Sequence, residues 1–90
     1  MDLADHRRGI DAIDRELLEL FQRRLRIAGE IASYKHEHEL PVLDSSREEQ
    51  KLRAVRESAE EELAEYCEEL FRQMMAVSRA YQEDLLGQKR

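Results

Sequence analysis

The feature that most constrains the fold is an apolar stripe that continues without a proline from Leu3 to about Glu37. Its apolar side chains recur at alternating spacings of three and four residues, which is the pattern of one face of a helix. Arg24 is the one charged interruption, and the apolar members are Leu3, Ile10, Ile13, Leu17, Leu20, Ile27, Ile31 and Tyr34. The stripe predicts one long first helix with a coiled-coil-like seam, which a partner helix would have to cover.

A turn and a second helix are expected after this stripe. The periodicity is lost over residues 38–43, where Pro41 removes an amide donor and disfavours helical conformation before it. Residues 44–46 read Asp-Ser-Ser, three good N-cap residues. Ser45 and Ser46 each have a glutamate three residues later, so either could form a capping box. A short second helix should therefore begin here.

A stronger apolar stripe predicts a third helix that ends near Gly87. Its members are Leu63, Cys67, Leu70, Met74, Val77, Tyr81 and Leu85. Gly87, before Gln88, Lys89 and Arg90, suits a left-handed C-terminal position. The boundary with the second helix falls between Ser58 and Glu62, a stretch without Gly or Pro. A continuous helix through this stretch, giving a two-helix hairpin that exchanges arms with a partner, is the alternative.

Length and composition favour a single all-α domain over residues 1–90 that needs a partner chain. A chain of 90 residues buries only roughly 60% of its unfolded surface and is marginal alone. Charged residues make up 40% of it, against three Gly and one Pro, which favours long solvated helices.

The same composition excludes several functional classes. One cysteine, Cys67, allows no intrachain disulfide, and the histidines show no metal-ligand spacing, so no metal is expected. A net charge of -6 argues against nucleic acid or an anionic membrane as a partner. The first twenty residues have no apolar run for a signal peptide or membrane span, which predicts a cytoplasmic protein.

A charged residue in an apolar seam is unfavourable unless it is solvated or paired, so the position of Arg24 requires an explanation. It could extend to solvent, pair with a carboxylate such as Glu48, or bind an anionic ligand. Lys35 follows eleven residues later and returns to within roughly 20° of the same direction, about 16 Å along the axis, so both heads can lean toward one ligand. Arg7 lies about 25 Å away in the other direction and can reach that ligand only from an antiparallel partner chain.

Three further residues are unexpected where they stand: two polar residues in an apolar face and one cation at the start of a helix. On the third helix Ser78 and Gln82 lie in the middle of an otherwise apolar face, where they either bond to neighbouring helices or line a polar pocket with Arg24. In the first turn of the second helix, Glu48 complements the helix dipole and Arg47 does not. Glu48 can thus be a simple cap, whereas Arg47 is not explained by such a role.

Taken in order along the chain, these residues resemble the AroQ-class chorismate mutases from about residue 7 to residue 82. The motifs are RRGIDAID at 7–14, followed by Arg24 and Lys35, then PVLD at 41–44 with Arg47-Glu48, and lastly Ser78 with Gln82. The resemblance implies an intertwined homodimer of three-helix chains with no cofactor. It also implies conversion of chorismate to prephenate in phenylalanine and tyrosine biosynthesis.

By this resemblance Arg24 and Arg7 of the partner subunit would bind the two carboxylates of chorismate. Ser78 would complete the carboxylate end directly, and Arg47 would do so through water or by ordering Glu48.

The same resemblance places Lys35 and Gln82 at the ether oxygen, and the backbone of Asp44 with the side chain of Glu48 at the ring hydroxyl. The catalytic residues would be Arg24, Lys35, Glu48 and Gln82.

This rearrangement is unimolecular and needs no nucleophile, which agrees with a sequence that offers no catalytic triad. Two alternatives stay open: an isochorismate-pyruvate lyase on the same fold, against which Asp44, Arg47 and Ser78 argue, and a noncatalytic helical dimerisation module. For the module, the seam would suffice and Arg24 would specify register.

Overall fold

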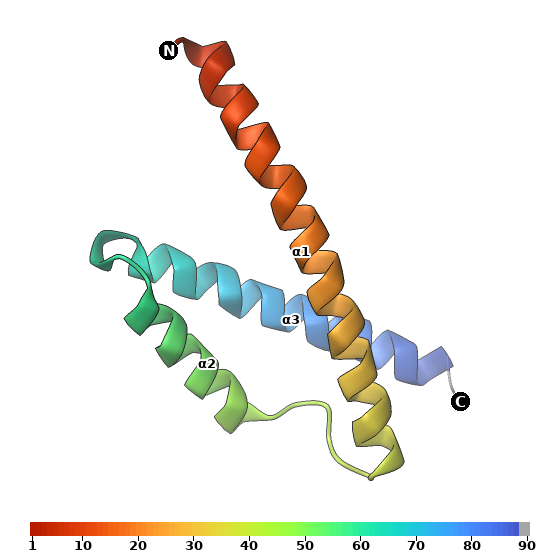
Figure 1. The fold of residues 1–90 in the computed structure, drawn as a ribbon. Coiled ribbons are helices and arrows are strands. Elements are labelled where there is room, and N and C mark those ends of the chain that lie inside the picture. The colour runs from red at the N-terminus through yellow and green to blue at the C-terminus, as the bar shows by residue number, and fades with distance from the viewer. Residues whose placement is uncertain (89–90) are drawn as a thin grey trace.

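The computed structural model describes residues 1–88, and within them the chain is entirely helical (Figure 1). Helix α1 spans Leu3–Glu37, α2 spans Ser45–Ser58, the short 3-10 helix η1 spans Glu61–Leu63, and α3 spans Ala64–Gln88. The three α-helices have 35, 14 and 25 residues. The predicted all-α class is confirmed, as is the order of a long, a short and a medium helix.

Helix α1 begins at a capping box that the sequence analysis did not consider. The Asp2 carboxylate accepts a hydrogen bond from the Asp5 backbone N–H at 2.9 Å, and Asp5 accepts one from the Asp2 N–H at 3.1 Å. The Asp2 N–H, followed by the Arg8 guanidinium, lowers the pKa of the Asp5 carboxyl. At the other end Leu40 donates its N–H to the Lys35 carbonyl at 2.7 Å, and this turn starts the loop to α2.

Helix α2 is capped by the first of its three candidate residues. The Asp44 side chain accepts a hydrogen bond from the Arg47 backbone N–H at 3.1 Å. Ser45 and Ser46 are consequently the first two residues of the helix, and the predicted serine capping boxes are wrong. The physical reason is that Asp44 already occupies the N-cap position and satisfies the amide at Arg47.

The chain does break between α2 and α3, so the alternative of one continuous helix is wrong. Ala59 and Glu60 both adopt extended backbone conformations, and the Leu63 N–H then bonds to the Glu60 carbonyl at 2.9 Å. The predicted left-handed conformation of Gly87 is also wrong, because Gly87 is helical and has no positive φ, and α3 is described as far as Gln88. Lys89 and Arg90 lie outside the described residues.

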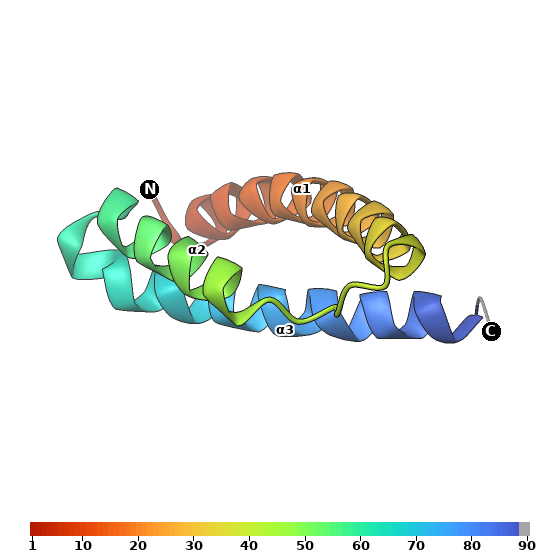
Figure 2. The same cartoon turned by 90° about the horizontal axis from the view of Figure 1, so that it is seen from below.

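Helix α3 packs against both other helices (Figures 1 and 2). In both views α2 lies beside the N-terminal half of α3, and α1 crosses its C-terminal half. The crossing uses the small residues Ala28, Gly29 and Ala32, which are all buried. A Cβ at Gly29 would lie 2.9 Å from Leu85 Cδ1 and 3.3 Å from Tyr81 Cε2. The two helices therefore approach closely because Gly29 has no side chain.

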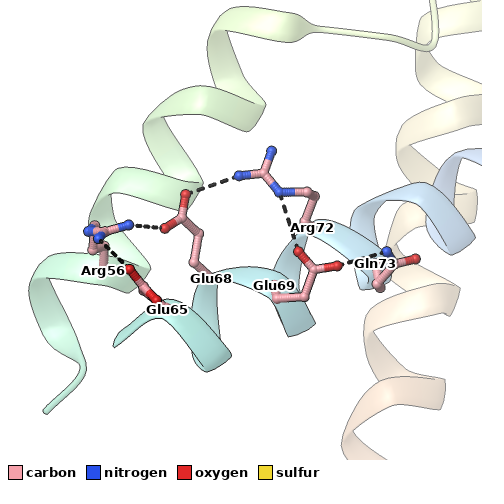
Figure 3. A network of polar contacts seen from close by, with 6 residues as sticks. All are labelled: Arg56, Glu65, Glu68, Glu69, Arg72 and Gln73. Atoms are coloured by element: carbon pink, nitrogen blue, oxygen red, sulfur yellow. Dashed lines mark hydrogen bonds and ion pairs between the residues drawn. The ribbon is translucent and has the colours of Figure 1, made fainter. Parts of the chain in front are cut away.

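A network of charged side chains joins α2 to the N-terminal half of α3 (Figure 3). Arg56 on α2 pairs with Glu68 and lies 3.8 Å from Glu65, both at the start of α3. Arg72, one turn further along α3, pairs with Glu68 at 3.0 Å. This network faces solvent and holds the two helices side by side.

The N-terminal half of α1 extends away from the other helices and leaves its apolar stripe uncovered (Figure 1). The exposed large apolar residues of this helix are Leu3, Ile10, Ile13, Leu17, Leu18, Leu20, Ile27, Ile31 and Tyr34, each at least 46% exposed. Among the described residues no helix is long and apolar enough to cross a membrane. In the single chain this stripe on α1 is therefore left uncovered.

Candidate active site

The three helices line an open cavity of about 330 Å³ beside the crossing of α1 and α3. Helix α1 provides one wall, the start of α2 a second, and the middle of α3 the third. Seven of the eight residues singled out in the sequence line it: Arg24, Lys35, Asp44, Arg47, Glu48, Ser78 and Gln82. The eighth, Arg7, is exposed on α1 and does not line this cavity.

Arg24 is held in place by Ser78. Its Nη1 donates a hydrogen bond to Ser78 Oγ at 2.8 Å, and the Ser78 hydroxyl donates in turn to the Met74 carbonyl at 2.8 Å. Within residues 1–88 no carboxylate pairs with Arg24, and Glu48 pairs with Arg79 instead. The explanation that Arg24 pairs with Glu48 is therefore wrong, and a half-buried guanidinium faces the cavity with its charge uncompensated by an ion pair.

Lys35 joins the end of α1 to the loop that leads into α2. Its Nζ donates a hydrogen bond to the Val42 carbonyl at 2.9 Å. An ammonium group has three N–H donors, so two remain for a ligand. Arg24 and Lys35 both line the cavity, as their eleven-residue spacing on one helix predicted.

Gln82 is a buried polar residue of α3, at 7% exposure. Its Nε2 donates a hydrogen bond to the Ala28 carbonyl at 2.8 Å, across the α1–α3 crossing. This bond fixes which way the amide points, because a carbonyl can only accept. One N–H of the amide is left over for a ligand in the cavity.

The α2 side of the cavity contributes two acidic and two basic residues. Asp44 is engaged as the N-cap, and Glu48 receives two hydrogen bonds from Arg79 Nη1 on α3. Arg47 and Lys51 lie one turn apart on α2 and both line the cavity.

Sequence reasoning missed Lys51 and Arg79. The spacing of Lys51 from Arg47 on one helix was a usable signal, since residues four apart share a face. The pairing of Arg79 with Glu48 had no such signal, because the two residues lie on different helices and 31 positions apart.

The lining residues combine a cationic half with an apolar half. Five cations, Arg24, Lys35, Arg47, Lys51 and Arg79, face two carboxylates, Asp44 and Glu48. Ile27 and Ile31 on α1 and Met75 on α3 supply apolar surface. A cavity of this kind suits a small anion with a carbon skeleton, since guanidinium and ammonium groups bind carboxylates and the apolar side chains take the rest.

The hydroxyl of Ser78 is not set up as a nucleophile. It donates its hydrogen to a backbone carbonyl and accepts from Arg24, so no base is in place to remove its proton. Across residues 1–88 no group of three His, Cys, Asp or Glu side chains could hold a metal ion. The described cavity can therefore act through donors and positive charge that confine and polarise an anion.

Such a cavity, in an all-helical chain of this size, defines a class of protein that binds a small anion between its helices. The family model for chorismate mutase type II matches residues 6–83, and the chain therefore belongs to that family. It is also 39% identical over 80 residues to the T-protein of Haemophilus influenzae, covering 87% of this chain. The chain spans 21% of the length of that relative. No solved structure matches.

The predicted family and enzyme class, a chorismate mutase and hence an isomerase, are confirmed by these matches. They give no support to the lyase or the dimerisation module over the mutase.

Proposed function

We propose that this cavity converts chorismate to prephenate. The observation that carries the proposal is the convergence of Arg24, Lys35, Glu48 and Gln82, from three helices, on one cavity in a member of this family. In the rearrangement the ether carbon–oxygen bond breaks while a carbon–carbon bond forms between the enolpyruvyl methylene and the ring. No atom leaves the molecule, so the protein supplies conformation and charge rather than a reactant.

Lys35 and Gln82 are the donors suited to the breaking ether bond. The oxygen gains negative charge in the transition state, and donors already aimed at it need no reorganisation when the reaction occurs. Both side chains line the cavity and are oriented by backbone carbonyls, Lys35 by Val42 and Gln82 by Ala28. Each keeps at least one free N–H, and these N–H groups would stabilise the oxygen.

The carboxylates of chorismate belong at the guanidinium groups. Arg24 offers a planar fork that Ser78 holds toward the cavity, and such a fork matches a carboxylate with two parallel hydrogen bonds. Glu48 accepts a hydrogen bond from the ring hydroxyl of chorismate, beside the Asp44 backbone. Arg47, whose side chain has no partner among the described residues, is available to the carboxylate end.

A second copy of the chain would complete the site. Ile27 and Ile31 belong both to the exposed stripe of α1 and to the wall of the cavity, and they are 56% and 46% exposed. A partner that covers the stripe would therefore also cover the open side of the cavity. With α1 helices antiparallel about a twofold axis, Arg7 of the partner subunit would enter there and bind the second carboxylate.

The direct test is the loss of chorismate absorbance after the purified chain is added, with prephenate identified as the product. We expect Arg24→Ala to abolish the loss. Release of pyruvate from isochorismate, without prephenate formation from chorismate, would contradict the proposal in favour of a lyase. No turnover of either compound by the folded chain would contradict it in favour of a noncatalytic module.

A further inference from the structure

Glu48 and Arg79 form an ion pair at the edge of the cavity that the sequence did not reveal. Both carboxylate oxygens of Glu48 accept hydrogen bonds from Nη1 of Arg79, joining α2 to α3. The side chains are only 25% and 34% exposed, and both line the cavity. The carboxylate is thus fixed at the place where the proposed function needs an acceptor for the substrate hydroxyl.

Arg47, the immediate neighbour of Glu48, does not perform this task. It contributes its backbone N–H to the Asp44 cap, and its guanidinium has no partner among residues 1–88. The ordering of Glu48 therefore falls to Arg79, from the opposite helix. Arg47 keeps its charge free for an anion.

A second ion pair joins the same two helices outside the cavity and serves as a comparison (Figure 3). Arg56 on α2 pairs with Glu68 on α3, but Arg56 is 52% exposed and neither residue lines the cavity. The Arg79–Glu48 pair differs in its position beside Ser78 and Gln82 and in its lower exposure. The chain therefore contains a matched control for the effect of tying α2 to α3.

We propose that Arg79 is a positioning residue that orients and neutralises Glu48, so that this carboxylate accepts the ring hydroxyl of a dianionic substrate without repelling it. The inference rests on the proposed function. An ionised carboxylate has about four lone-pair sites, and Arg79 occupies one on each oxygen, so sites on both oxygens stay available. An unpaired carboxylate beside two substrate carboxylates would instead oppose binding, because like charges repel more strongly in a partly buried site.

The test compares Arg79→Met, Arg79→Lys and Arg56→Met. We expect Arg79→Met to lower kcat/KM about tenfold, mainly through KM, because the hydroxyl contact and the charge act on bound substrate and transition state alike. Arg79→Lys should restore most of the loss, since an ammonium keeps the charge beside Glu48. Arg56→Met should keep the wild-type kinetics, although it removes an ion pair between the same helices.

A double-mutant cycle separates positioning from a direct role. In a Glu48→Gln background, Arg79→Met should cause less than about a twofold further loss, because its partner carboxylate is already gone. An additive loss would overturn the proposal, since Arg79 would then act without Glu48. Wild-type kinetics in Arg79→Met would overturn it too, as would equal losses of activity and melting temperature in Arg79→Met and Arg56→Met.

A structural readout keeps this inference apart from the proposed function. Crystal structures of the wild type and of Arg79→Met should show the Glu48 carboxylate turned away from the cavity only in the variant. An unchanged Glu48 would overturn the positioning role even if the chain converts chorismate. A wild-type chain that leaves chorismate unchanged would contradict the proposed function, while the same pair of structures would still decide whether Arg79 holds Glu48.

Discussion

Arg24 and Ser78 lie 54 positions apart in the chain and are joined by a 2.8 Å hydrogen bond from Nη1 to Oγ. The hydroxyl hydrogen of Ser78 is already donated to the Met74 carbonyl. Ser78 therefore offers Arg24 an acceptor rather than offering the cavity a donor. In this arrangement its effect on a bound anion passes through the guanidinium that it orients.

Ser78→Ala should lower kcat/KM for chorismate about tenfold, since a hydrogen bond to a charged group contributes roughly 1.5–3 kcal/mol and part of it is recovered by water. The loss should be smaller than in Arg24→Ala, because the guanidinium remains. Ser78→Thr, which keeps a hydroxyl oxygen, is the control. If Ser78→Ala and Arg24→Ala lost activity to the same extent and additively, Ser78 would be a direct ligand of the substrate.

Lys35→Met should lower kcat by roughly a hundredfold or more, the range seen when one preorganised donor to a developing oxyanion is removed. Chorismate binding should weaken less, because the charge at the ether oxygen appears only in the transition state. The variant also loses the bond to Val42, so its melting temperature must be measured beside its kinetics. A higher KM with an unchanged kcat would instead assign Lys35 to binding of the carboxylates.

The helices and the part of the candidate site that lies on α1 could be predicted because their signals are local. The proline-free stripe determines α1, and the helical period puts Arg24 and Lys35 on one side of it. A carboxylate or hydroxyl before a helix predicts a cap, although three candidates in a row left the choice of Asp44 open. The resemblance to a family then gathered residues from three helices that spacing alone could not bring together.

Contacts between helices were not predictable from one chain. Glu48 was expected to cap or to pair with Arg24, and it pairs with Arg79, because the rotation of α3 against α2 decides which cation faces it. The break after Ser58 was predicted in the right stretch, residues 58–62, although no Gly or Pro marks it. It follows from two extended residues, Ala59 and Glu60, neither of which is a helix breaker by type.

Gln82→Glu should make activity depend on low pH. The side chain is 7% exposed and donates to the Ala28 carbonyl, so burial and this acceptor would both raise the pKa of the introduced carboxyl above its usual value of about 4.3. The protonated form can donate like the amide, and the ionised form cannot.

Because the folded state of this variant holds its proton more tightly than the unfolded state, its stability should also be highest at low pH. This stability should fall as the pH rises from the pKa that the introduced carboxyl has in the unfolded chain to the higher pKa that it has in the folded chain. The measurement is kcat/KM and melting temperature against pH, with the wild type as control. Equal pH profiles for the variant and the wild type would contradict the role of Gln82 as a donor.

Gly29→Val should destabilise the chain by about 1–3 kcal/mol through overpacking at the α1–α3 crossing. A Cβ at this position already lies 2.9 Å from Leu85 Cδ1 and 3.3 Å from Tyr81 Cε2, and valine adds two methyl groups to it. Ala54→Val on the exposed face of α2 is the control, since it changes only helix propensity, by roughly 0.7 kcal/mol or less. Equal denaturation midpoints for the two variants would show that the helices can separate without cost.

Mixing two inactive variants should restore activity if each site is built from two chains. Arg7→Ala and Arg24→Ala each damage both sites of a homodimer. In a heterodimer of the two variants, one site combines Arg24 of the first chain with Arg7 of the second and is intact, while the other site carries both defects. Refolding an equal mixture should therefore give about a quarter of the wild-type activity per chain, since about half of the dimers are mixed and half of their sites are intact.

The control for this complementation is a mixture of Arg24→Ala with Lys35→Met, whose defects fall on the same side of the site. Every mixed dimer of that pair has one damaged residue in each site, so no activity should return. Complementation in the control, or its absence from the Arg7 and Arg24 mixture despite mixed dimers seen by mass spectrometry, would contradict a shared site. Because Arg7 lies about 25 Å from Arg24 along α1, that result would leave Arg7 outside the reach of the same substrate.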